Sequence, residues 1–277
     1  MKKNLLFVLF ISLAFYSCSS NDEDLQEITN INNQELMPEK ILKSIIGLDQ
    51  NEPIASYDYY QLFAYNNQGK LIKVTRDYFN FIYPIYVNLE YNGNTITVEN
   101  RSDDTSVIFP KNSVIYTVNN NGKIKEKYVT VPNGGYIYAV KKYYYEYNAD
   151  GRLYQIKLTY PNITPGTPYY FELDDFERVD TFFYSGDNLN KIVSQSLKDY
   201  KSHSNIRTET EFSDYDNAKN PFKRLGLLDS YFYRSLSENN YRKLKTFYYD
   251  ENNVQSLSSV SSWTFSYDHN NNIILGF

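Results

Sequence analysis

Acidic side chains are the residues of this chain whose types and spacing could perform chemistry. The densest group consists of Asp174, Asp175, Glu177 and Asp180. Two such carboxyl groups on neighbouring strands could serve as the acid and base of a glycan-cleaving enzyme. No spacing in the sequence selects a pair, and a solvated loop carries the same composition. We therefore favour a solvated loop over a catalytic pair.

The sequence offers few candidate ligands for a metal ion. Carboxylate and amide oxygens that could bind Ca²⁺ come from Glu211, Asp214, Asp216 and Asn220. They lack the ordered spacing of an EF-hand, so a role in stabilising a turn is favoured. The two histidines, His203 and His269, show no metal-ligand spacing with other residues. We predict no metal site.

Motifs for covalent or cofactor chemistry are missing from the sequence. It contains no Gly-x-Ser-x-Gly elbow, no phosphate-binding glycine loop and no dinucleotide-binding fingerprint. The single cysteine, Cys18, lies next to the N-terminal apolar run and is assigned to lipid below. We therefore predict a protein that is not an enzyme, with no catalytic residues and no cofactor.

The N-terminus has the pattern of a signal peptide. Lys2 and Lys3 precede an apolar run over residues 5–15, which is too short to span a membrane. Cys18 follows that run and resembles the lipobox cysteine of bacterial lipoproteins, which becomes the lipidated N-terminus. The resemblance implies that residues 1–17 are removed and that Cys18 holds the protein in the membrane. The alternative is an incidental cysteine near a simple secretory cleavage site.

The residues after Cys18 predict a tether. Residues 21–24, "NDED", resemble the surface-export signal of Bacteroidota lipoproteins, although a solvated tether would have the same composition. Residues 18–37 show no alternation and are interpreted as a flexible acidic tether. Residues 38–277 are the predicted folded domain. The resemblance implies an outer-membrane lipoprotein that faces the cell exterior.

Net charge limits the choice of partners. The full chain has a formal net charge of −5, which becomes −7 once Lys2 and Lys3 leave with the first 17 residues. An acidic surface disfavours nucleic acid and anionic membranes. We predict no nucleic-acid partner, and attachment to a membrane only through the lipid.

Composition predicts an all-β fold. The chain has 30 tyrosines and 17 phenylalanines but only 2 methionines and 1 tryptophan, and asparagine is abundant. Such a composition favours strands separated by turns. Residues 38–48 fit either a short helix or a strand, and we favour the strand.

A repeated turn motif predicts β-hairpins. The stretch "YEYNADGRLYQI" from Tyr145 has an aromatic-x-aromatic start, a turn rich in Asn, Asp and Gly, and then alternating apolar residues. Asn and Gly tolerate the positive φ that such turns require, so Gly151 is expected there. Similar stretches begin at Phe63, Leu89, Tyr116, Phe182, Phe247 and Phe265, and an eighth with a longer loop begins at Phe212.

The spacing of these turns predicts an antiparallel meander of about 14 to 16 strands. It would form an open curved sheet or a water-soluble barrel. In the strand after the Tyr145 turn, alternation places Tyr154, Ile156, Leu158 and Tyr160 on one apolar face.

Two resemblances follow from these motifs. Residues 145–153 resemble the YD repeat of Rhs-type shells, but the irregular spacing argues against a true shell. Residues 214–222, "DYDNAKNPF", with "SENN" at 237–240, are similar to Bacteroidota surface lipoproteins that carry a domain of unknown function described as porin-like. That resemblance implies a porin-like fold and no particular activity.

A membrane-embedded outer-membrane β-barrel is the alternative that the resemblance raises. Such a barrel needs a continuous apolar band toward the lipid. The predicted strands carry Lys, Asn, Ser and Thr on one face and much Tyr on the other. We therefore favour a sheet that faces water.

The tyrosines are the remaining candidates for a site. Tyr57 and Tyr59 share a strand face, as do Tyr143, Tyr145 and Tyr147, and such rings could stack on a glycan or anchor a protein ligand. Core packing in a β-sheet explains them without any ligand, and we favour core packing for most of them. We predict a binding or scaffold lipoprotein, with a carboxylate-dependent glycan-active enzyme or a membrane barrel as alternatives.

Overall fold

The computed structural model describes residues 35–42, 60–77, 85–107, 113–133, 136–162, 177–197 and 206–276. By its internal contacts the chain divides into Met1–Glu35 and Leu36–Phe277, and every described strand and helix belongs to the second unit. Cys18 and the predicted signal peptide lie outside the described residues. Among the described helices, none combines the length and the apolar character needed to cross a membrane.

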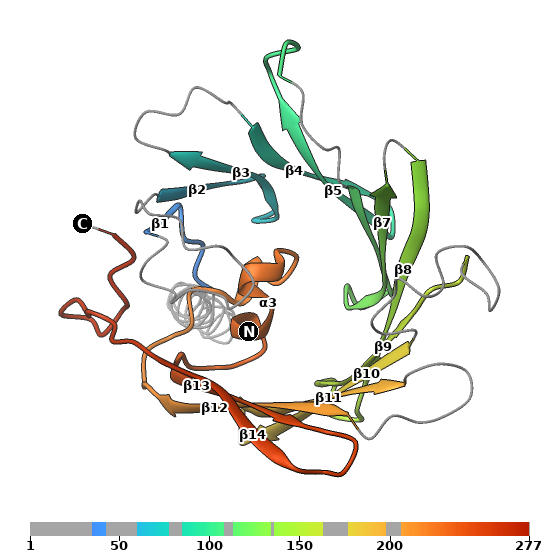
Figure 1. Ribbon diagram of the computed structural model, residues 1–277. Helices are drawn as coiled ribbons and strands as arrows, with labels where there is room; N and C mark the ends of the chain where they lie inside the picture. The colour runs from blue at the N-terminus through green and yellow to red at the C-terminus, as the bar shows by residue number, and fades with distance from the viewer. Residues whose placement is uncertain are drawn as a thin grey trace, which may run out of the picture. The chain divides into compact units, whose positions relative to one another are not determined.

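The described strands form one antiparallel sheet in which each strand pairs with its sequence neighbours. They are β1 (Lys40–Leu42), β2 (Tyr60–Tyr65), β3 (Leu71–Asp77), β4 (Ile85–Asn92), β5 (Thr95–Ser102), β6 (Ser113–Val118), β7 (Ile124–Asn133), β8 (Tyr136–Tyr147), β9 (Leu153–Thr159), β10 (Glu177–Ser185), β11 (Asn188–Leu197), β12 (Arg207–Tyr215), β13 (Tyr241–Tyr249) and β14 (Gln255–Ser262). The sheet has 14 strands, which confirms the predicted all-β meander. It is the open form, because β1 and β14 do not pair (Figure 1).

Five turns share one geometry, and it explains the repeated motif. The first residue is Asn or Asp, and its side-chain oxygen accepts backbone N–H groups from the residues that follow in the turn. The fourth residue has positive φ: Gly69, Gly122, Gly151, Asn253 and Asn271. Gly151 has φ +77°, which confirms the expectation for this turn. Glycine and asparagine occupy this position because other side chains are strained there.

A β-bulge corrects the predicted face of one strand. Leu153, Ile156 and Leu158 of β9 and the following Tyr160 are buried, whereas Tyr154 is 42% exposed. Leu153 pairs with Tyr147 and Gln155 pairs with Glu146, so Tyr154 is an extra residue between them. The alternation predicted from Tyr154 onward was therefore wrong at its first position, because a bulge shifts the faces by one residue.

The eighth predicted hairpin contains an insertion that fills the curve of the sheet. Between β12 and β13, residues 216–240 form η3 (Lys223–Leu225), η4 (Asp229–Tyr231) and α3 (Phe232–Ser235). We call residues 216–240 the inner segment. Figure 1 shows α3 within the curve of the sheet, so the face that points toward it is the concave face.

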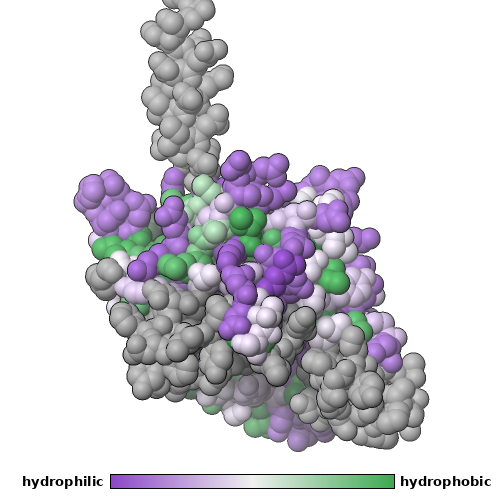
Figure 2. Space-filling model, turned by 90° about the horizontal axis from the view of Figure 1, so that it is seen from above, coloured by the Kyte–Doolittle hydropathy of each residue, from purple (hydrophilic) through white to green (hydrophobic). Residues whose placement is uncertain are grey.

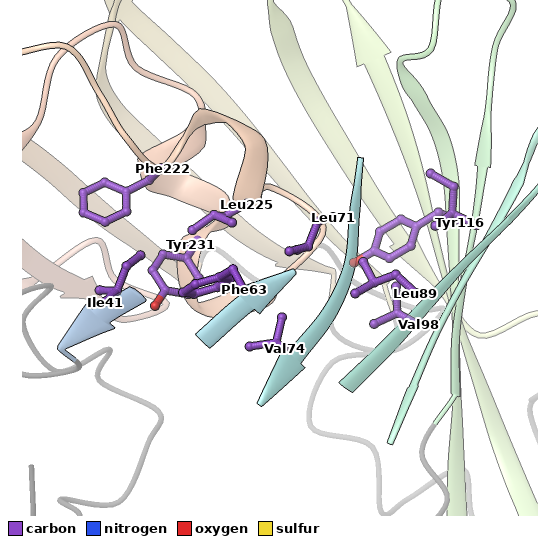
Figure 3. Close-up of a cluster of buried hydrophobic side chains, with 11 residues drawn as sticks. Ile41, Phe63, Leu71, Val74, Leu89, Val98, Tyr116, Phe222, Leu225 and Tyr231 are labelled. Atoms are coloured by element: carbon purple, nitrogen blue, oxygen red, sulfur yellow. The ribbon is translucent and has the colours of Figure 1, made fainter. Parts of the chain in front are cut away.

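Two hydrophobic clusters join the inner segment to the concave face. Phe222, Leu225 and Tyr231 of the inner segment are fully buried against side chains from β1 to β6 (Figure 3). Phe232 and Leu236 pack against the second cluster, which includes Leu153, Ile156, Phe182, Leu189, Ile192, Phe212 and Tyr241. Burial of one large apolar side chain contributes roughly 1.5–3 kcal/mol. The inner segment is therefore part of the core.

The chain after β14 packs against both the inner segment and the first strand. We call residues 263–276 the C-terminal segment. Its Phe265 and Ile273 form a small cluster with Ala218 of the inner segment. The carbonyl of Leu275 accepts a 2.7 Å hydrogen bond from the N–H of Leu42 in β1. The predicted strand at 38–48 is confirmed for Lys40–Leu42, and residues 43–48 lie outside the described residues.

Candidate functional site

A buried polar network fixes the inner segment between its two flanking strands. The carboxylate of Asp216 accepts hydrogen bonds from the backbone N–H of Asn240 at 3.0 Å, from the Asn240 side chain at 3.1 Å and from the Tyr267 hydroxyl at 2.9 Å. The Asn220 amide donates to the carbonyls of Arg234 at 2.7 Å and Ser237 at 2.8 Å. These bonds satisfy buried backbone groups where the regular ladder is interrupted.

The same network attaches the inner segment to the sheet. The Ser237 hydroxyl accepts a 3.0 Å hydrogen bond from the N–H of Leu189, and Asn188 and Asn239 bond to each other through side chain and backbone. The polar residues of the "DYDNAKNPF" and "SENN" motifs are thus structural. They hold the inner segment against β11 and β12.

Arg234 is enclosed by aromatic rings. Its residue is 4% exposed, and its guanidinium lies 4.3 Å from the ring of Tyr241 and 4.7 Å from that of Trp263. Phe222 and Phe265 lie slightly farther away, at 5.5 and 5.7 Å. The four rings come from the inner segment, β13 and the C-terminal segment. Cation–π attraction therefore joins three parts of the chain at one point.

Beyond the apolar core, the concave face becomes polar. Lys127 of β7 forms an ion pair with Asp229 of the inner segment, with 2.5 Å between Nζ and Oδ1. Its ammonium lies 5.6 Å from the ring of Tyr116 and 5.4 Å from that of Tyr143. The Lys127 side chain is 10% exposed, whereas that of Asp229 is 76% exposed. The ion pair therefore reaches from the sheet into an accessible space.

A second ion pair lies on the same face. Arg178 and Asp180 are two residues apart on β10, and Arg178 Nε is 3.1 Å from Asp180 Oδ1. Hydroxyl side chains follow Asp180 across the neighbouring strands, because Asp180 lies opposite Ser194 of β11 and Ser194 lies opposite Thr208 of β12. Paired residues of an antiparallel sheet share a face. We define the inner polar surface by six residues: Lys127, Tyr143, Arg178, Asp180, Asp229 and Tyr233.

Electrostatics fix the charge states of this surface. Burial raises the pKa of Tyr143; Arg178 acts in the opposite direction, and Asp229 and Asp180 raise it further. Burial alone would lower the pKa of Arg178, but the Asp180 carboxylate, with Tyr233 and Tyr143, raises it overall. At neutral pH the Tyr143 hydroxyl is therefore protonated and the Arg178 guanidinium is charged.

The convex face of the sheet carries charged side chains that form ion pairs. Lys142 and Glu126 form an ion pair at 3.3 Å, and Lys191 and Glu209 form one at 3.2 Å. Arg101 pairs with Glu90 at 2.7 Å and also contacts Glu99. Figure 2 shows hydrophilic residues interspersed with small hydrophobic patches over the side of the molecule in view. Ion-paired charges and scattered apolar residues therefore share this face.

The structure places three of the five predicted stacking tyrosines on the concave face. Tyr143, Tyr145 and Tyr147 are partly buried and pack against the second cluster. Tyr145 meets Phe232 of the inner segment edge to face, with ring centroids 6.1 Å apart. Burial raises the pKa of Tyr147 to about 12. Tyr57 and Tyr59 lie outside the described residues.

The candidate carboxylates are distributed over several environments. Asp180 belongs to the inner polar surface, whereas Glu177 pairs with Lys157 at 3.5 Å; Asp174, Asp175 and His203 lie outside the described residues. Asp214 forms an ion pair with Arg242. The side chains of Asp216 and Asn220 hold the inner segment. Glu211 lies opposite Lys191 of β11 and Lys245 of β13 in the strand register. Within the described part of the chain, no group of three His, Cys, Asp or Glu side chains could hold a metal.

Sequence reasoning missed most of the inner polar surface, although a signal for two of its residues was present. Lys127 and Arg178 stand at positions where the alternation of their strands calls for an apolar residue. A charge in such a position marks a concave face that is not fully covered by the core. Asp229 gives no local signal, because it meets Lys127 across 102 residues of chain.

Comparisons with known proteins agree on the fold alone. No family model matches the chain, and no curated protein has a detectably similar sequence. A porin-like protein from Bacteroides uniformis ATCC 8492 shares the fold with a TM-score of 0.50 and 13% identity, covering 84% of this chain and 86% of that one. A porin-like protein from Bacteroides vulgatus ATCC 8482 shares the fold with a TM-score of 0.51 and 14% identity, covering 86% of this chain and 90% of that one. The chain therefore shares its overall fold with these porin-like proteins.

Proposed function

We propose that this protein is a lipid-anchored, non-catalytic binding module of a bacterial cell envelope, and that it holds its ligand on the inner polar surface. The porin-like Bacteroides structures support an envelope protein. The position of Cys18 after an apolar run and the "NDED" sequence support a lipid anchor on the outer membrane that faces the exterior. The YD-like phrase at 145–153 is one turn of the meander, and we propose no Rhs-type shell.

The observation that carries this proposal is the polar character of the concave face beyond the core. Two ion pairs, the Tyr143 hydroxyl and a row of Ser and Thr hydroxyls place hydrogen-bond donors and acceptors side by side. Tyr233 adds a ring that is 36% exposed beside them. Rings combined with many polar groups suit a neutral, hydroxyl-rich ligand such as a glycan.

A carboxylate-dependent enzyme is less well supported by this surface. Its two carboxylates, Asp180 and Asp229, each have a cation within ion-pair distance. Both carboxylates are therefore engaged with a cation, whereas the acid and the base of a glycosidase must contact the glycosidic oxygen and the anomeric carbon or a water. The arrangement thus supports binding more than acid catalysis.

Glycan binding by the full chain, purified in mild detergent, tests the proposal. A panel of labelled polysaccharides should contain at least one that binds, and Asp229→Asn and Tyr233→Ala should each weaken that binding. Tyr154→Ala is the matched control, because Tyr154 is similarly exposed but lies at the bulge of β9. Equal losses in all three variants, or no binding by the parent, would contradict the proposal. Hydrolysis that Asp229→Asn abolishes would establish the enzyme instead.

A further inference from the structure

The last strand of the sheet has an unusual edge. Among the described strands, β14 pairs with β13 alone, and it is the final strand in the sheet order. Leu257 is 58% exposed and Val260 is 50% exposed, so both apolar side chains stand largely in solvent. An uncovered edge strand is a template for pairing with another chain, and proteins usually protect it with charge, proline or a covering segment.

β14 has none of the protective charges. No Asp, Glu, Lys, Arg, His or Pro occurs between Glu251 and Asp268, although 22% of the whole chain is charged. The opposite edge of the sheet is different. β1 has only three residues, and the C-terminal segment covers it through the bond from Leu42 to Leu275. The two edges therefore cannot join head to tail, which leaves like-to-like pairing of β14.

A bulge makes β14 complementary to itself. Leu257 pairs with Phe247 and Ser259 pairs with Thr246, so Ser258 is the extra residue. Because of this extra residue, Leu257 and Val260 point to the same convex face in spite of their odd spacing. In an antiparallel pair of two β14 strands centred between residues 258 and 259, Leu257 of each copy would lie opposite Val260 of the other. This register buries four exposed apolar side chains with no facing charges.

We propose that the protein forms a two-fold symmetric dimer in which the β14 strands of two copies pair and join their sheets. The occupant of the edge is a second copy of the chain, because the edge is neutral and self-complementary. The rest of the chain is acidic, so two copies would repel each other through other surfaces. A two-fold interface closes on itself, so the assembly stops at two. This inference is independent of the ligand proposed above.

The mass of the full chain in mild detergent gives the first test. We expect the mass of two chains by light scattering, after the detergent contribution is subtracted. Leu257→Lys/Val260→Lys should halve that mass by placing like charges opposite each other. Ile115→Lys/Phe183→Lys is the matched control, because it adds the same charge at exposed apolar residues of the convex face and should remain dimeric. A monomeric parent, or equal masses for the two variants, would overturn the proposal.

Cross-linking in intact cells gives a second test that does not depend on the stability of the lysine variant. Residues paired across antiparallel strands lie about 4.5–5.5 Å apart at Cα, within the range that a disulfide can bridge. Leu257→Cys/Val260→Cys should therefore form a covalent dimer under mild oxidation. Each single variant keeps Cys18 and should give no more dimer than the parent. No covalent dimer from the double variant would overturn the proposed pairing.

Discussion

At the scale of the residue, the turn position with positive φ allows a clean test of local strain. A Cβ added at Gly122 would meet no atom within 4 Å, so only backbone conformation decides the cost of a side chain there. Gly122→Val should lower the free energy of unfolding by roughly 1 kcal/mol or more. Gly122→Asn should cost clearly less, because Asn253 and Asn271 occupy the equivalent position. Urea unfolding measures both, and equal losses would contradict this explanation.

The same reasoning gives a larger effect at Gly151. There an added Cβ would also collide with the Lys123 ammonium, which bonds to the Gly151 carbonyl. Gly151→Val should therefore destabilise the protein more than Gly122→Val in the same measurement. A smaller loss at Gly151 would show that Lys123 moves away without cost.

Buried tyrosines predict a loss of stability at high pH. Burial raises the pKa of Tyr91 to about 12, and its hydroxyl donates to the carbonyl of Leu71 at 2.8 Å. The unfolded tyrosine ionises near pH 10. The stability that the protonated, buried Tyr91 contributes is therefore fully present below about pH 10 and is lost as the pH rises from about 10 to 12. Tyr91→Phe should make stability fall less steeply over this window than it does in the parent protein. Unfolding midpoints at pH 9, 10 and 11 measure the slopes.

At the scale of the element, Arg234 connects the inner segment to β13 and the C-terminal segment. Its planar guanidinium matches the surrounding rings, and its Nη1 donates to the carbonyl of Tyr241 at 3.3 Å. Arg234→Lys keeps the charge but loses the planar contact, and should cost about 1–2 kcal/mol in urea unfolding. Arg242→Lys is the matched control, because that arginine forms a surface pair with Asp214 and should cost at most about 1 kcal/mol. Equal costs would argue against the aromatic enclosure.

The elements also show how far sequence reasoning could go. The hairpins were predictable because each turn is determined within about five residues, as in the turn from Asn148 to Arg152. The inner segment was not, because it depends on contacts such as the one from Tyr231 to Gln61, which are 170 residues apart. The site divides in the same way. Lys127 breaks a local pattern and could have been noticed, whereas its partner Asp229 becomes a neighbour only through the fold.

At the scale of the whole molecule, the lipid anchor makes a direct prediction. Cys18 is the only thiol of the chain and follows an apolar run as a lipobox cysteine does. Cys18→Ala should abolish labelling with radioactive fatty acid and release the protein from the membrane fraction. Ser17→Thr keeps the cysteine and serves as a control that should remain labelled. Persistent labelling of Cys18→Ala would exclude this residue as the site of the lipid.

The convex face predicts how the folded domain behaves once the anchor is removed. Lys142 and Lys191 lie near the middle of β8 and β11, and each has a carboxylate partner. If this face met lipid, each cation at the bilayer midplane would cost roughly 2–4 kcal/mol, and several such residues would exceed the stability of an ordinary domain. Toward water the same charges cost nothing and keep an acidic protein dispersed.

Residues 20–277, expressed without the signal peptide and Cys18, should therefore be monodisperse in buffer that contains no detergent. The measurement is size-exclusion chromatography with light scattering, repeated with and without mild detergent. Because the inner segment already covers the apolar part of the concave face, detergent should change neither the elution volume nor the protein mass. Aggregation that only detergent reverses would mean that the convex face meets lipid, and the membrane-embedded barrel would then replace the anchored binding module.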